Sequence, residues 1–89
     1  LHTIGQTIPV TGKVTDAAGT PVANANVVVK GTQTGTSTNS EGTFSLNATV
    51  GKTLVISAIG YTSKEVVVEN ISGAFTANVT LEASVNKLD

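Results

Sequence analysis

The residues capable of nucleophilic catalysis are few in this chain. His2 is the single histidine, and there is no cysteine. A Ser-His-Asp arrangement needs an imidazole base that is held in place beside the nucleophile, whereas His2 lies in a terminal segment that we expect to be flexible. The absence of cysteine also excludes a thiol nucleophile and a zinc site built on cysteines. The sequence therefore predicts no catalytic residues.

The acidic residues are the next candidates, as paired carboxylates for acid and base catalysis. Glu65 and Glu69 fall on the same face of a predicted strand, about 13 Å apart at about 3.3 Å per residue. The paired acids of a glycosidase lie closer together than this. We interpret both as exposed charges that discourage edge-to-edge aggregation of strands. The full set of acidic residues is Asp16, Glu41, Glu65, Glu69, Glu82 and Asp89.

One short segment, Thr38–Gly42, places oxygen-bearing side chains before a glycine, as calcium loops do. It lacks the full ligand set and the terminal acid of an EF-hand loop. Asn39 and Gly42 both tolerate positive φ, so a tight turn between two strands explains them without an ion. The pattern predicts a turn and no metal-binding residues.

No cofactor-binding motif is present either. Gly51-Lys52-Thr53 precedes a predicted strand and not a helix, and Gly31 and Gly35 do not open a helix, so none of them forms a phosphate-binding loop. Glycosylation signals of the N-x-[ST] type are expected by chance in a threonine-rich chain and matter only in a eukaryotic secretory setting. They occur at Asn47, Asn70 and Asn78.

Tyr61 and the edges of the predicted sheets are the remaining candidates for binding. Tyr61 follows Ile59-Gly60, and it could serve in surface recognition. A lone tyrosine at a sandwich corner more often packs its ring and bonds its hydroxyl to the backbone, and we favour that interpretation. Exposed strand edges remain available to an added strand from a partner. The sequence assigns no partner-binding residue.

Composition restricts the function classes further. The 89 residues suffice for one domain. The formal charge is -1, the five lysines are spread along the chain, and there are only three aromatic rings, so nucleic-acid binding is not expected. No apolar run approaches the length of a membrane helix. Residues 1–4 do not resemble a signal peptide, so we expect a cytoplasmic protein or the mature or excised part of an exported one.

Alternating apolar and polar residues predict the elements that would position all these side chains. Thr and Val are abundant, as is typical of strands, and Gly, Pro, Asn and Asp separate the runs. We predict an antiparallel β-sandwich of six or seven strands with an aliphatic core, in which Phe44 and Phe75 are the largest residues. Gly12 falls on the apolar face of its strand, which indicates a bulge or a close approach. The predicted strands are 8–16, 25–30, 34–38, 43–48, 54–59, 63–69 and 75–82.

The order of these motifs resembles the carboxypeptidase-regulatory-like domain over about positions 9–82. Val29-Lys30-Gly31-Thr32, Gly35-Thr36 and Ile59-Gly60-Tyr61 resemble more narrowly the N-terminal extension of SusC/RagA-type TonB-dependent outer-membrane transporters. That family commonly has Asp-x-Asp-Gly where this chain has Asn39-Ser40-Glu41-Gly42, which argues further against a metal. The motifs that carry the resemblance are Gly12–Asp16, Gly19–Val22, Ala25–Thr32, Gly35–Thr36, Thr38–Leu46 and Ile59–Tyr61.

The resemblance implies a transthyretin-like, seven-stranded Greek-key sandwich without a cofactor, on the periplasmic side of the Gram-negative outer membrane. Such a domain is non-catalytic and does not itself insert into the membrane. Its partners would be the plug and barrel of its own transporter chain, which imports glycans or peptides, and TonB-system or other periplasmic proteins. The alternative is a regulatory or spacer module of an exported carboxypeptidase, glycan-degrading enzyme or adhesin. A stand-alone enzyme is the weakest of the three.

The same resemblance divides the chain into three parts. We expect residues 1–7 to form a flexible N-terminal segment, residues 8–82 to form the β-sandwich, and residues 83–89 to form a linker. Asn86-Lys87-Leu88-Asp89 resembles the approach to a TonB box, which in such transporters follows closely as a hydrophobic segment led by an acidic residue.

Overall fold

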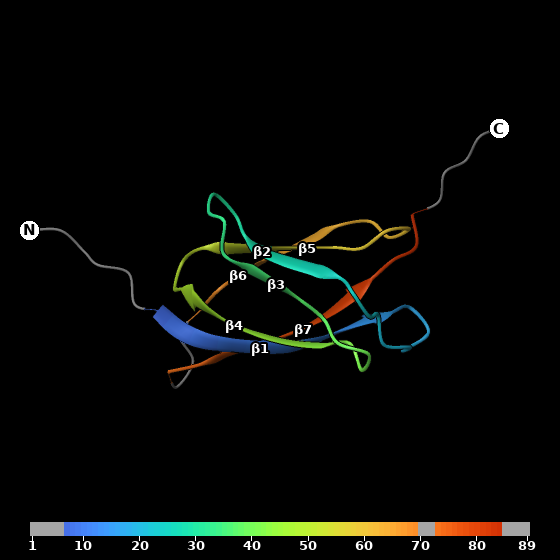
Figure 1. The fold of residues 1–89 in the computed structure, drawn as a ribbon, viewed down its shortest axis with the longest axis horizontal. Helices are drawn as coiled ribbons and strands as arrows, with labels where there is room; N and C mark the ends of the chain where they lie inside the picture. The colour runs from blue at the N-terminus through green and yellow to red at the C-terminus, as the bar shows by residue number, and fades with distance from the viewer. Residues whose placement is uncertain (1–6, 70–72, 85–89) are drawn as a thin grey trace, which may run out of the picture.

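Seven strands form two facing layers in the computed structural model, which describes residues 7–69 and 73–84 (Figure 1). The predicted all-β, seven-stranded sandwich is therefore confirmed. Within the described residues, no helical segment is long and apolar enough to cross a membrane. The strands are β1 (Thr7–Asp16), β2 (Asn26–Val29), β3 (Gly35–Ser37), β4 (Thr43–Thr49), β5 (Thr53–Ser57), β6 (Lys64–Val67) and β7 (Phe75–Leu81).

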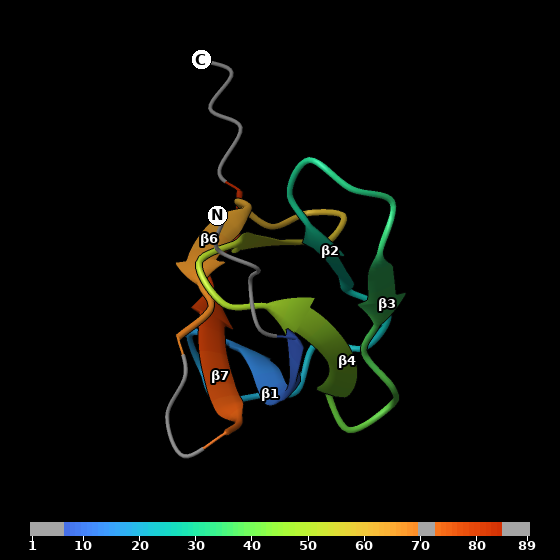
Figure 2. The ribbon, with the colours of Figure 1, turned by 90° about the vertical axis from the view of Figure 1, so that its left-hand side faces the viewer.

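One layer is a three-stranded sheet in the order β4-β1-β7, and the other is a four-stranded sheet in the order β3-β2-β5-β6. Figure 2 shows the two layers stacked, with β3 beside β4 at one side and β6 beside β7 at the other. The ladders between named strands are antiparallel, as predicted, except that β1 pairs with β7 in parallel. Alternation fixes which face of a strand is buried but not its direction, so the sequence could not indicate this pair.

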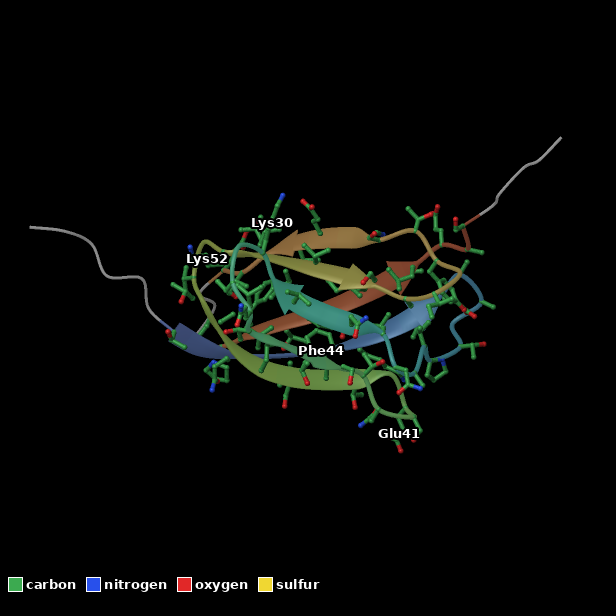
Figure 3. The ribbon with its side chains drawn as sticks, turned by 45° about the horizontal axis from the view of Figure 1, so that its top comes forward. Lys30, Glu41, Phe44 and Lys52 are labelled. Carbon is green, nitrogen blue, oxygen red and sulfur yellow. The ribbon has the colours of Figure 1, made fainter. Side chains whose placement is uncertain are left out.

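The core between the sheets consists of the aliphatic residues that the alternation predicted. Val10, Leu54 and Ile56 are fully buried, and Figure 3 shows the ring of Phe44 between the layers. The expectation for the second ring is wrong, because Phe75 is only half-buried at the start of β7. An edge strand leaves its first inward side chain without a neighbour on one side, so this ring stays partly accessible.

Gly12 is a point of close approach between the three strands of the β4-β1-β7 sheet. The β1 register runs through Gly12 without interruption, opposite Phe44 on one side and Ala77 on the other. A Cβ placed there would lie 1.9 Å from the carbonyl oxygen of Ala77 and 2.7 Å from the Phe44 ring. Of the two predicted explanations, close approach is therefore the one observed, and there is no bulge.

The sixth strand is shorter than predicted. β6 ends at Val67, which pairs with Thr53, the first residue of β5. Val68 therefore has no partner in β5. Its N–H donates instead to the carbonyl oxygen of Lys52, in the turn before β5. Glu69 lies beyond the strand, so the expectation that it shares a strand with Glu65 is wrong. The spacing estimated for an extended strand does not apply to these two carboxylates.

Candidate interaction surface

The acidic residues of the described chain do not converge. Glu41 sits at the turn before β4 and points outward, well away from Lys30 and Lys52 (Figure 3). Within residues 7–69 and 73–84, no three His, Cys, Asp or Glu side chains are grouped as metal ligands. The predicted candidates His2 and Asp89 lie outside the described residues.

Asp16 and Asn39 have a structural role in turns. The Oδ1 atom of Asp16 accepts backbone N–H bonds from Ala18 and Thr20, both at 2.9 Å. Asn39 does the same at the turn before β4, where its Oδ1 accepts from the N–H of Glu41 at 2.9 Å and of Thr43 at 3.0 Å. These are Asx turns, in which a side chain replaces a backbone acceptor.

The predicted turn at Asn39–Gly42 is therefore confirmed, with one correction to its mechanism. Gly42 has a positive φ of 78°, but Asn39 is not among the residues with positive φ. Asn39 shapes the turn through its side-chain oxygen. That oxygen accepts two backbone N–H bonds, which explains its place in the turn.

Thr38 is a buried polar residue whose role was not predicted from the sequence. Its hydroxyl donates to the Val22 carbonyl oxygen at 2.7 Å and accepts from the Ala25 N–H at 2.9 Å. The side chain is only 3% exposed, so it ties the chain after β3 to the loop before β2. The signal was its position in the alternation, since Thr34, Thr36 and Thr38 share one side of the predicted strand.

Tyr61 packs against the core, as predicted. The residue is half-buried against the core, and it forms an antiparallel bridge with Ala83. The hydrogen bond predicted for its hydroxyl stays a prediction. The residue therefore contributes to packing at the edge of the core.

Two shallow hollows mark the surface, and neither brings together reactive groups. One of about 190 Å³ lies between β4 and the β2–β3 turn and includes Asn47 and Lys52. The other, of about 260 Å³, includes Asp16 and Tyr61. Both are smaller than typical small-molecule pockets of about 300 Å³ or more. Asp16, the acid in the second hollow, already accepts two backbone N–H bonds.

The outer faces of the two sheets differ in chemistry. The three-stranded sheet exposes hydroxyl and amide side chains, with Lys13 as the charged residue among the described ones. Val28 and Val67 are exposed on the four-stranded sheet. There Lys30 Nζ lies 3.5 Å from Glu65 Oε2, with both side chains more than half exposed. Such a pair contributes little to stability.

Comparison with known proteins places these features in a family. A model of the CarboxypepD_reg-like domain matches residues 10–89. The TonB-dependent receptor SusC of Bacteroides thetaiotaomicron is 44% identical over all 89 residues, and the TonB-dependent receptor P39 of Formosa agariphila is 36% identical over 81 residues. The chain spans about 8% of the length of each of these relatives.

Solved structures agree on the fold. A chain of a type II cohesin–X-dockerin complex from Acetivibrio cellulolyticus superposes with a TM-score of 0.66 at 19% identity, over 85% of this chain and 58% of that one. A Bacteroides fragilis protein of unknown function gives 0.66 at 22% identity, over 92% of this chain and 30% of its own. Identities this low bear on the fold alone. Taken with the family model, which covers nearly the whole sequence, they lead to one conclusion: the chain belongs to the CarboxypepD_reg-like domain family.

Proposed function

We propose that this chain is a non-catalytic accessory domain of a TonB-dependent outer-membrane transporter for glycans or peptides, and that it acts on the periplasmic side by binding. The observation that carries the proposal is the 44% identity to a TonB-dependent receptor over the full chain. In this proposal residues 8–82 are the folded unit and residues 83–89 are a linker leading toward a TonB box. The partners are the plug and barrel of the same chain and periplasmic proteins of the TonB system.

The geometry supports a binding role over a catalytic one. Asp16 and Asn39 use their side-chain oxygens to shape turns, and Thr38 uses its hydroxyl to join two loops. The Glu65 carboxylate pairs with an exposed lysine. Each of these polar groups has a structural explanation, which leaves surfaces and strand edges as the means of action.

Deletion of this domain from its parent protein tests the proposal. We expect a transporter without residues 8–82 to reach the outer membrane in normal amount but to import its nutrient more slowly. The amount in the membrane is measured by immunoblot and uptake by labelled substrate. Unchanged uptake would contradict the proposal. A parent gene product that carries a hydrolase or adhesin repeats, and no plug and barrel, would favour the regulatory or spacer alternative.

The purified chain should also lack hydrolase activity. Assays on model peptides, esters and glycosides, each with and without added divalent metal, should give no turnover above buffer. Robust turnover would overturn the non-catalytic part of the proposal.

A further inference from the structure

The backbone of β7 has one side that its own sheet does not use. The direction of the backbone groups follows from β1, the central strand. The Val14 N–H donates to Gly42 and the Val14 carbonyl oxygen accepts from Val22, so the even-numbered residues of β1 direct their backbone groups toward β4. Backbone groups alternate along a strand. The odd-numbered residues of β1 therefore face β7.

The register of the parallel ladder then fixes which groups of β7 are used. Thr11 pairs with Thr76, and Lys13 pairs with Asn78. In a parallel ladder, a residue that faces its partner strand bonds to the two neighbours of its register partner. The bonds from β1 therefore reach Phe75, Ala77 and the odd-numbered residues beyond them. The N–H and C=O groups of Thr76, Asn78 and Thr80 point away from the sheet.

Two hydrogen bonds past the end of β7 confirm this parity. The Thr62 N–H donates to the Glu82 carbonyl oxygen at 2.8 Å, and the Ser84 N–H donates to the Gly60 carbonyl oxygen at 2.9 Å. Glu82 and Ser84 thus also face outward. The chain before β6 already lies as an added strand against the extension of β7, antiparallel to it at Tyr61 and Ala83. It covers the edge beyond β7, and no other strand within residues 7–69 and 73–84 pairs with the outward side of β7 itself.

The other sheet edges are less suited to accept a strand. β3 has only three residues, and β6 carries Lys64 and Glu65; short and charged edges discourage pairing. At β4, the Thr43 carbonyl oxygen accepts from Asn39 and the Thr49 carbonyl oxygen accepts from Lys52. Local turns thus occupy both ends of β4. β7 has seven residues with no charge, proline or glycine.

The side chains beside this edge define what would fit. Thr76, Asn78 and Thr80 are exposed on the outer face, whereas Phe75 and Val66 are half-buried and pack against the core. A strand added at β7 would place polar side chains beside the exposed Thr76, Asn78 and Thr80. It would place apolar side chains beside the half-buried Phe75 and Val66. Its alternation would match that of β7, and cross-strand pairs of this kind stabilise sheets.

We propose that the free edge of β7, through the outward backbone groups of Thr76, Asn78 and Thr80, binds an extended segment of a partner polypeptide as an added strand. The segment alternates apolar and polar residues. The proposal rests on the proposed function, because it names the surface by which the accessory domain binds its partner. Main-chain hydrogen bonds supply the affinity of such strand addition, and alternate side chains supply the specificity.

A second copy of the chain fits this edge less well than a single segment does. If two β7 strands paired antiparallel about Asn78, position 74 of each copy would fall opposite Glu82 of the other. The Thr62 backbone already occupies that place through its 2.8 Å bond. The symmetric pair would meet this obstruction at both ends, whereas one extended segment can stop before it.

Peptide selection and amide exchange test the proposal on the 89-residue chain. A random library of seven-residue peptides is selected against the protein, and the amide protons are followed by NMR. In the free protein, the amides of Thr76, Asn78 and Thr80 should exchange faster than those of Ala77 and Val79. Selected peptides should alternate apolar and polar residues and slow exchange at the three outward amides. Selection of no binding peptide, or protection elsewhere, would overturn the proposal.

Proline substitutions separate the edge from the rest of the surface. Asn78→Pro removes an outward N–H and should weaken peptide binding about tenfold or more, since several hydrogen-bonded positions are lost. Ser45→Pro is the matched control, because Ser45 is exposed on β4 and also faces away from β1. Equal weakening by the two variants would overturn the proposal. Should Asn78→Pro not fold, Thr76→Lys with Thr80→Lys places charge along the same edge and should weaken binding similarly.

The periplasmic domain of TonB, added as a second probe, distinguishes this inference from the proposed function. Protection of the three amides by this domain supports both. Protection by selected peptides alone supports the strand site and removes TonB as the proposed partner. Binding of the TonB domain at other residues retains the proposed function and overturns the β7 site. Concentration-dependent dimers that protect the same amides would overturn the choice of occupant.

Discussion

The two sheets of this sandwich differ in the length of their strands and in how closely the backbones of neighbouring strands approach a glycine. In the three-stranded sheet, the long strands β1, β4 and β7 meet at Gly12, where the Ala77 backbone and the Phe44 ring approach too closely for a side chain. The four-stranded sheet has strands of three to five residues and contributes aliphatic side chains such as Leu54 and Ile56 to the core.

The outer faces of the two sheets also differ, in the kind of side chain that they expose. The exposed large hydrophobic residues of the described chain are Val28 and Val67 on the four-stranded sheet and Ile59 in the loop that leaves it. On the described strands of the three-stranded sheet, every exposed residue except Pro9 is polar. Backbone contact tolerates no added atom, whereas side-chain contact can adjust. Substitutions in the two sheets should therefore have effects of different size.

Gly12→Ala should have the largest effect on stability. The added Cβ would lie 1.9 Å from the Ala77 carbonyl oxygen, so β7 must move away from β1 and the core must open with it. We expect a loss of about 3 kcal/mol in the free energy of unfolding, measured by urea denaturation. Thr11→Ala, on the exposed face of the same strand, is the control and should change it by about 0.5 kcal/mol or less.

A second variant locates the source of that effect. Phe44→Leu combined with Gly12→Ala removes the 2.7 Å contact with the ring but leaves the contact with the Ala77 backbone. The double variant should therefore recover little of the stability lost on introducing the Cβ. Full recovery would show that side-chain packing and not backbone contact is limiting, and the contrast between the sheets would be lost.

Thr38→Val should come next, because it removes a buried hydroxyl without changing the shape of the side chain. The Val22 carbonyl oxygen and the Ala25 N–H would both lose their partner. An unsatisfied buried polar group costs about 1–3 kcal/mol, so we expect a loss of about 2 kcal/mol by thermal or urea unfolding. Thr36→Val, on the adjacent β3, is the control. A similar loss in both variants would exclude the hydrogen bonds as the cause.

Much of this fold follows from local pattern. The alternation of Ala25, Val27 and Val29 predicted a buried face, and the structure buries all three. The same reasoning marked Gly12 as either a bulge or a close approach, because a glycine on an otherwise apolar face needs such an explanation, and the structure shows the close approach. Strand direction did not follow, since the parallel pairing of β1 with β7 depends on contacts between the two ends of the chain.

The candidate surface was less accessible to sequence reasoning. The sequence indicated that sheet edges were available but not which one, because the free side of β7 depends on the register with β1. The free side of β7 also depends on where the edge beyond β7 becomes covered. Tyr61 forms a bridge with Ala83 there, although the two residues are far apart in the sequence. Partner choice between distant segments is not encoded in the alternation of either segment.

Asp16→Ala should have a smaller effect than Thr38→Val, because it acts at an exposed turn. The variant removes the acceptor for the Ala18 and Thr20 N–H groups at the end of β1, but water can replace it. We expect a loss of about 1 kcal/mol in the free energy of unfolding. Asp16→Asn keeps the acceptor oxygen and should stay close to the parent protein. If Asp16→Asn loses as much as Asp16→Ala, the charge and not the turn geometry is responsible.

The smallest effect should come from the ion pair on the outer face of the four-stranded sheet. Glu65→Gln removes the charge that faces Lys30 at 3.5 Å, but the side chains are 62% and 55% exposed. An exposed pair of this kind contributes about 0.5 kcal/mol or less, and we expect that loss at low ionic strength by urea denaturation. Glu69→Gln makes the same charge change outside the strand and is the control. In about 1 M salt, where screening acts over about 3 Å, the two variants should become indistinguishable. A loss near that of Thr38→Val would mean that a solvent-exposed charge pair holds this sheet together, and the distinction between the two sheets would have to be redrawn.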